Sequence, residues 1–169
     1  MEVKTPLTKE VIDKLHIGDQ ITITGKIYCG RDAALPKLMR LYEKNELEKH
    51  HIDLQGGIIF HTAVSEAGIG PTSSNKVELE GSMPLLSQAG IKMHLGKGKL
   101  SKETVKILNE KGAVFAVTPP ISALLTATMT SKKIAAFPEE GIEALYEITV
   151  KDFPAIIAIA HGESIFERE

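Results

Sequence analysis

Residues 91–117, IKMHLGKGKLSKETVKILNEKGAVFAV, carry the pattern that decides the fold. Ile91 to Leu95 is a short apolar run typical of a buried strand, and Ala113 to Val117 is a second one. Between them Ser101 is a typical helix N-cap, and Gly112 follows the last helical position. Two buried strands joined by one helix form a β-α-β unit. The segment therefore predicts an α/β fold.

The segments on either side extend this pattern into one domain, residues 1–169. The predicted strands are residues 21–28 and 56–61 before the unit, and 133–137, 144–150 and 155–160 after it. Four helices are predicted. The first is residues 9–15, with Thr8 as its N-cap, and the second begins after the strand at 21–28, with Asp32 or Leu35 as its cap. The third begins at Ser82–Pro84 and ends at Gly90, and the fourth is residues 121–129. The last three strands have short connections, which favours antiparallel pairing. We expect one compact α/β domain with a mixed sheet.

Composition excludes several classes of function. The formal net charge is −2 with a pI of about 6.3, so the basic surface of a nucleic-acid-binding protein is missing. The longest apolar run, residues 153–160, is far shorter than the roughly 20 residues of a membrane span. We expect a cytoplasmic protein that contacts neither nucleic acid nor membrane.

The metal-binding residue types give little support for a metal site on this chain. Cys29 is the only cysteine and cannot by itself hold an iron–sulfur cluster, so a small buried side chain is its expected role. None of the six histidines lies three or four residues from another, and we predict no histidine-based metal site. Glu143 and Asp152 are candidate acid–base groups, although their strand context favours structural roles.

Residues 70–76, Gly-Pro-Thr-Ser-Ser-Asn-Lys, are a candidate anion pocket on the loop after the strand at 56–61. Gly70 can bring bare backbone close to a ligand, and the following N–H groups can converge on negative charge. Thr72 and Ser73 add hydroxyls, and Lys76 adds a positive charge. The alternative is a solvated polar turn, and these residues alone do not decide between the two.

Two further cations stand next to predicted strand ends. Arg31 lies at a strand-to-helix junction, a position where ligand groups often bind, although its position alone favours a plain surface arginine. Lys97 lies between two glycines that leave it unobstructed, and the alternative is a plain surface turn.

Several separated segments resemble one family. Residues 5–8 (TPLT), 25–34 (ending in RDAA), 70–74 (GPTSS), 96–98 (GKG) and 143–155 (from EAL to DFPA) are similar in order and spacing to the β subunit, or C-terminal domain, of class I iron–sulfur fumarases and L(+)-tartrate dehydratases. The resemblance covers nearly the whole chain. It implies a swivelling β/β/α-type domain and a separate α subunit that carries a [4Fe-4S] cluster. It also implies a β-β contact in a hetero-oligomer, with the active site between the two kinds of subunit.

The resemblance also implies roles for residues already named. The reaction would be the reversible hydration of fumarate to malate, a step of the tricarboxylic acid cycle. Arg31 and Lys97 would bind substrate carboxylate together with the Gly70, Ser73 and Lys76 positions. Thr72 would stand near the proton-transfer position, which requires an electropositive pocket because a threonine hydroxyl is a poor base.

The sequence departs from the family pattern at several places. Lys76 stands where arginine is usual, and a lysine cannot form the planar two-bonded contact with a carboxylate. Leu35 replaces a usual histidine, the loop at residues 64–69 is short, and Thr118–Pro120 replaces a glycine-rich segment. Three hypotheses follow: a fumarate hydro-lyase subunit, the same chemistry on tartrate or another small diacid, and a non-catalytic anion-binding or assembly module.

Overall fold

The structure, a computed structural model, describes residues 1–65, 68–69 and 76–167, without the side chains of 76–79 and 167. The helices are α1 (Lys9–Asp13), α2 (Ala34–Glu43), α3 (Lys76–Gln88), α4 (Lys102–Lys111) and α5 (Ser122–Ala127). The strands are β1 (Glu2–Lys4), β2 (Gln20–Gly30), β3 (Ile58–His61), β4 (Met93–Gly96), β5 (Val114–Val117), β6 (Met129–Ala136), β7 (Leu145–Ala160) and β8 (Glu163–Ser164). Three 3₁₀ turns, η1 (Glu48–His50), η2 (Pro138–Glu143) and η3 (Ile165–Glu167), complete the elements. The predicted α/β class with a mixed sheet is confirmed.

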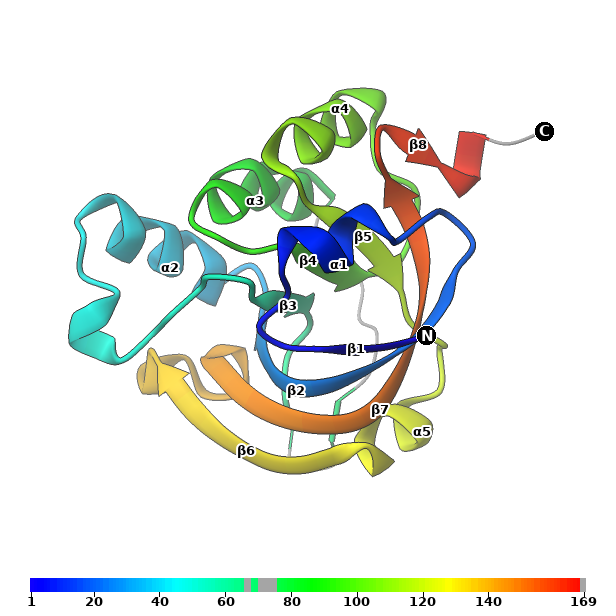
Figure 1. Cartoon of the computed structure of the whole chain (residues 1–169). Coiled ribbons are helices and arrows are strands. Elements are labelled where there is room, and N and C mark those ends of the chain that lie inside the picture. The colour runs from blue at the N-terminus through cyan, green and yellow to red at the C-terminus, as the bar shows by residue number, and fades with distance from the viewer. Residues whose placement is uncertain (66–67, 70–75, 168–169) are drawn as a thin grey trace.

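Five of the strands close into a ring. Strands β2, β3, β4 and β5 pair in parallel in that order, and β7 pairs antiparallel with both β2 and β5. Ile156 of β7 is opposite Gln20 on one side and Val117 on the other, so the ring has no open edge there. Figure 1 shows β7 as a long curved strand, with β6 along its outer side.

The inside of the ring is the main hydrophobic core. Alternate residues point inward, so Ile58 and Phe60 of β3 lie in this core while Ile59 lies in a second core outside the ring. Phe60 meets Phe153 of β7 edge to face, with ring centroids 5.7 Å apart. Each such fully buried side chain contributes about 1.5–3 kcal/mol to folding.

Helices α2, α3 and α4 cover the outer face of the parallel strands, as Figure 1 shows. Leu35 and Leu38 of α2 and Leu86 of α3 pack with Ile59 and Leu145. Helix α4 buries Val105 and Leu108 against Phe115 of β5. The short helix α5 instead places Leu125 in the inner core.

Three predicted helix caps are confirmed. The Thr8 hydroxyl accepts a hydrogen bond from the Val11 N–H, and the Ser101 hydroxyl accepts one from the Thr104 N–H. Gly112 ends α4 with a φ of 69°, in the left-handed region that glycine adopts without strain.

Two predicted helix starts are wrong. Helix α2 begins at Ala34 after Ala33, which makes no side-chain cap; neither Asp32 nor Leu35 caps it, and Leu35 is buried in the outer core. Helix α3 begins at Lys76 and contains Pro84 in its interior, whereas Ser82–Pro84 was expected to start it. Met83 and Leu86 are fully buried on either side of the proline, and this packing offsets the hydrogen bond that Pro84 cannot make.

The C-terminal strands also differ from the prediction. Residues 144–150 and 155–160 were expected as two strands, but they form the single strand β7. Asp152 has a φ of 57° and lies near a register shift in β2 between Ile23 and Gly25, so the strand bends there without ending. Helix α5 is shorter than residues 121–129, because β6 already starts at Met129.

Candidate active-site edge

Four adjacent parallel strands end at one level of the ring. Gly30 at the end of β2 is opposite His61 at the end of β3, and Gly96 at the end of β4 is opposite Val117 at the end of β5. The residues that follow these ends are Arg31, Thr62, Lys97 and Thr118. We call this side of the ring the carboxyl edge. In open and barrel-like α/β folds, ligands bind where parallel strands end.

Arg31 follows β2 and is held by a residue from the other end of the chain. Its Nε donates to both carboxylate oxygens of Glu143, at 2.8 and 2.9 Å. Both side chains are about one quarter exposed. Glu143, at the end of the turn η2 and not in a strand, therefore fixes the direction of the arginine.

Lys97 follows β4 in an exposed loop at the same edge. It makes no ion pair among the residues that the structure describes. Only β3 separates its strand from the strand of Arg31, so the two backbones lie roughly 10 Å apart, two strand spacings. Long side chains at that spacing can reach opposite ends of one small anion.

The loop after β3 is anchored before it reaches the predicted anion motif. The Val64 N–H donates to the Ile142 carbonyl, and Ser65 and Gly68 exchange backbone hydrogen bonds at 3.1 Å. The Ile69 N–H donates to the Thr126 hydroxyl at 3.1 Å, and that hydroxyl donates back to the Ile69 carbonyl. The chain is thus tied to α5 immediately before Gly70.

The motif itself lies largely outside the described residues. Gly70, Thr72 and Ser73 are not among them, and Lys76 is described only as the first residue of α3. What the structure adds is their context: β3 and its anchored loop come before the motif, and α3 comes after it. Their predicted roles stay predictions.

The sequence analysis missed two buried polar groups at the carboxyl edge. His61 Nδ1 and Thr118 Oγ1 are buried and have no hydrogen-bond partner among the described residues. His61 also contacts His94 of the neighbouring strand β4. The sequence contained a signal for this contact. His61 and His94 each lie in a short apolar run, and the two runs were predicted to be consecutive strands.

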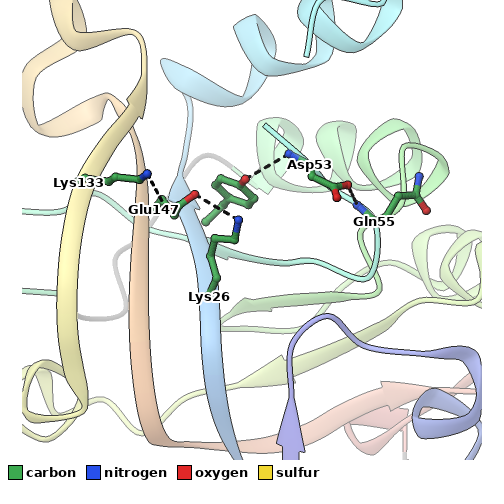
Figure 2. Close-up of polar contacts among 6 residues, drawn as sticks. Lys26, Asp53, Gln55, Lys133 and Glu147 are labelled. Atoms are coloured by element: carbon green, nitrogen blue, oxygen red, sulfur yellow. Dashed lines mark hydrogen bonds and ion pairs between the residues drawn. The ribbon is translucent and has the colours of Figure 1, made fainter. Parts of the chain in front are cut away.

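A second polar cluster lies elsewhere on the outside of the ring. Figure 2 shows Glu147 of β7 between Lys26 of β2 and Lys133 of β6, at 3.4 and 3.2 Å. A small cavity of about 190 Å³ opens beside Lys26, lined also by Asp53 and Gln55. The cluster joins three strands, and because carboxylates of Glu147 and Asp53 stand beside Lys26, it is a poor anion site.

The described residues contain no group of three histidine, cysteine or acidic side chains that could hold a metal ion. Cys29 is fully buried inside the ring, and burial raises the pKa of its thiol far above the usual value. Its position therefore does not suit a cluster ligand. Over the same described part of the chain, no helix is long and apolar enough to cross a membrane.

The fold and edge define an α/β domain with cationic groups gathered where parallel strands end. Comparison with known proteins identifies the family. The family described as "Fumarase C-terminus" matches residues 1–169. The chain therefore belongs to this family, and the predicted resemblance is confirmed.

Individual relatives are of two lengths. A protein of Methanocaldococcus jannaschii provisionally named L(+)-tartrate dehydratase subunit beta is 34% identical, over 95% of this chain and 88% of its own length. The L(+)-tartrate dehydratase subunit beta of Escherichia coli is 29% identical, over 95% and 84%. A protein of Geobacillus stearothermophilus provisionally named class I fumarate hydratase is 32% identical, over 98% of this chain but only 33% of its own length. This chain thus covers most of each of these two tartrate dehydratase β subunits but only one third of the fumarate hydratase.

Proposed function

We propose that this chain is the β subunit of a hydro-lyase that reversibly hydrates fumarate to malate, in a site shared with a separate α subunit. One observation supports this most: Arg31, Lys97 and the anchored loop that leads to Gly70 all lie at the carboxyl edge. The domain that carries them matches the family over residues 1–169. Hydration of a dicarboxylate requires that two carboxylates be held while a proton moves at carbon.

The chain's own contribution is to bind and orient. Lys97 supplies a charge with no ion-pair partner among the described residues, and the Glu143 carboxylate holds the Arg31 guanidinium in one direction. Each can hydrogen-bond a substrate carboxylate. We assign proton transfer to Thr72, with Gly70, Ser73 and Lys76 completing the anion pocket, from the family resemblance alone.

The remaining chemistry belongs to a partner. The single buried cysteine cannot bind a [4Fe-4S] cluster, so we propose that the α subunit holds one and that its iron supplies the Lewis acid. The lengths of the relatives support a partner: the named β subunits are about as long as this chain, whereas this chain covers only one third of the class I fumarate hydratase.

L(+)-tartrate is the second candidate substrate. Two relatives that match this chain over most of their own length are named as tartrate dehydratase β subunits. The presence of Lys76 where the family pattern has arginine also fits a site reshaped for another diacid.

The test is assembly followed by turnover. The purified chain, alone and after anaerobic assembly with its α-type partner, is assayed on fumarate, L-malate and L(+)-tartrate. We expect no iron-dependent colour and no activity from the chain alone, and both from the complex. Preference for fumarate or tartrate decides between the substrates. A stable complex that turns over no C4 diacid would leave only the non-catalytic binding module.

A further inference from the structure

Strand β6 extends beyond the carboxyl edge. Strand β5 ends at Val117, which is opposite Ile156 of β7. Strand β6 starts at Met129, which is opposite Val150, six residues nearer the start of β7. Because β5 and β6 both run antiparallel to β7, β6 continues along β7 in the direction in which β5 ends. Strand β6 therefore lies past the level at which the parallel strands end.

Two neighbouring lysines of β6 point to opposite faces of the sheet. Lys132 is opposite Ile148, whose side chain lies in the core inside the ring. Lys133 is opposite Glu147 and pairs with it at 3.2 Å on the outer face, as Figure 2 shows. Successive residues of a strand alternate between its faces, so Lys132 lies on the face that continues the inside of the ring. Of the two lysines, Lys132 is the one directed toward the carboxyl edge.

A hydrogen bond agrees with this direction. Lys132 Nζ donates to the Ser65 carbonyl at 3.3 Å. Ser65 belongs to the anchored loop after β3, which is tied to α5 and leads to Gly70. The same carbonyl also accepts the Gly68 N–H, which uses both of its lone pairs. From β6, Lys132 thus touches the loop that precedes the predicted anion motif.

The charge of Lys132 is not neutralised by the described part of the protein. It makes no ion pair with any residue that the structure describes. An ammonium carries three N–H donors, and the described contacts use one of them. The side chain is exposed, so a small anion can reach it without displacing a protein group.

The spacing between Lys132 and Arg31 suits a small diacid. Lys132, Ile148 and Ile27 are opposite one another across β6, β7 and β2. Arg31 follows Ile27 by four residues. Two strand spacings across and four residues along β2 put the Cα atoms of Lys132 and Arg31 at most roughly 17 Å apart. Two long side chains that extend toward each other would cover most of this separation and leave a gap for a four-carbon diacid.

We propose that Lys132 is a further substrate-binding residue, whose ammonium binds one carboxylate of the small diacid while the Ser65 carbonyl holds it in place. The proposal deepens the proposed hydro-lyase function and rests on it, since that function supplies the anionic ligand. It gives β6, a strand without a predicted site residue, a direct part in the site.

The first test measures binding without turnover. Succinate is a C4 diacid that can be neither hydrated nor dehydrated, and its affinity for the assembled complex is measured by calorimetry. Lys132→Met should weaken succinate binding by roughly 10- to 100-fold, and Lys132→Arg, which keeps the charge, by only about threefold or less. Lys133→Met is the matched control, because it removes the same charge from the opposite face of the same strand. Its affinity should stay within about twofold of wild type, and thermal unfolding checks that each variant is folded.

A third substitution separates substrate contact from loop anchoring. The amide of Lys132→Gln can still donate to the Ser65 carbonyl but carries no charge. We expect it to bind succinate as weakly as Lys132→Met. Affinity near wild type for Lys132→Gln would overturn the carboxylate contact and make Lys132 an anchor of the loop only. The KM of the diacid that the complex turns over should follow the same order, with a smaller effect on kcat.

The outcomes separate the two proposals. Equal succinate affinities and equal KM values for Lys132→Met and Lys133→Met in an active, folded complex would overturn the role of Lys132 and leave the hydro-lyase function intact. A wild-type complex that binds succinate but turns over no C4 diacid would overturn the hydro-lyase function, and the variants would still decide whether Lys132 contacts the bound diacid. A complex that neither binds nor turns over any C4 diacid would overturn both.

Discussion

Arg31 Nε lies 2.8 Å from Glu143 Oε1 and 2.9 Å from Glu143 Oε2, although the two residues are 112 positions apart. Arg31 follows β2, and Glu143 ends the turn η2 before β7. The pairing of β2 with β7 brings these two ends together, because Cys29 is opposite Tyr146. A candidate substrate-binding arginine is thus oriented by the closure of the ring.

Arg31→Lys should lower kcat/KM for the diacid by roughly 10- to 100-fold, since an ammonium cannot bond Glu143 and a carboxylate in the same fixed geometry. Glu143→Gln should have a smaller effect, because it removes the charge and keeps one acceptor. Steady-state kinetics on the assembled complex measure both. Unfolding free energies should change by no more than about 1 kcal/mol, as expected for a partly exposed pair. A large stability loss with unchanged kinetics would make the pair structural only.

Thr72→Val should lower kcat by roughly 10²-fold or more with little change in substrate affinity, because it removes the hydroxyl assigned to proton transfer and keeps the side-chain shape. Single-turnover kinetics and equilibrium binding of the diacid to the complex distinguish the two effects. Thr8→Val, which changes a threonine remote from the carboxyl edge, is the control. A kcat near that of wild type would return Thr72 to the role of a turn residue.

Gly68→Ala should disturb the anchored loop. Gly68 has a φ of +128°, and a Cβ there would collide with the Thr126 side chain that bonds Ile69. We expect a local cost on the order of 1–3 kcal/mol and a loss of kcat/KM larger than the stability loss explains. Urea unfolding and kinetics measure these. Gly18→Ala is the matched control, since φ is +89° there and no atom lies within 4 Å of the added Cβ.

Cys29 should be inert to thiol reagents in the folded chain, because it is fully buried and burial raises the pKa of its thiol. Reaction with Ellman's reagent at pH 8 should be undetectable until denaturant is added, and one thiol per chain should then react. Ser131→Cys, on the exposed surface of β6, should react at once as the control. Fast reaction of wild type would show that the ring opens more easily than its packing indicates.

Acid should destabilise the fold through the buried histidines. The unfolded chain binds a proton at His61 below pH 6.5, whereas the folded chain does not until about pH 3, so stability falls as the pH drops through this window. From pH 6.5 to 5 the loss at His61 is on the order of 2 kcal/mol, and His94 adds to it in the same direction.

Urea unfolding at pH 7.5 and pH 5 measures this loss. The double variant His61→Phe and His94→Leu should show a smaller difference between the two pH values, whatever its absolute stability. His50→Gln should not change the difference. If the double variant loses as much stability in acid as wild type, the two rings are not neutral in the folded state.

Local physics determined much of this protein from sequence alone. Helix α4 was predictable because Ser101 and Gly112 cap its two ends, and the strands flanking it because their side chains are apolar and bounded by turn residues. Arg31 and Lys97 could be named as candidates because each directly follows such a strand. The order of the motifs was enough to indicate the family.

Only the tertiary structure decided which distant residues meet. Pattern could not show that β7 continues past Asp152, because a bend with positive φ has the same sequence signs as a strand end. Nor could it show that β7 closes the ring, which pairs Glu143 with Arg31. His61, His94 and Ser87 have no periodic spacing, and their contact depends on strand register and on the position of α3. Such contacts arise from long-range packing, which local propensity does not encode.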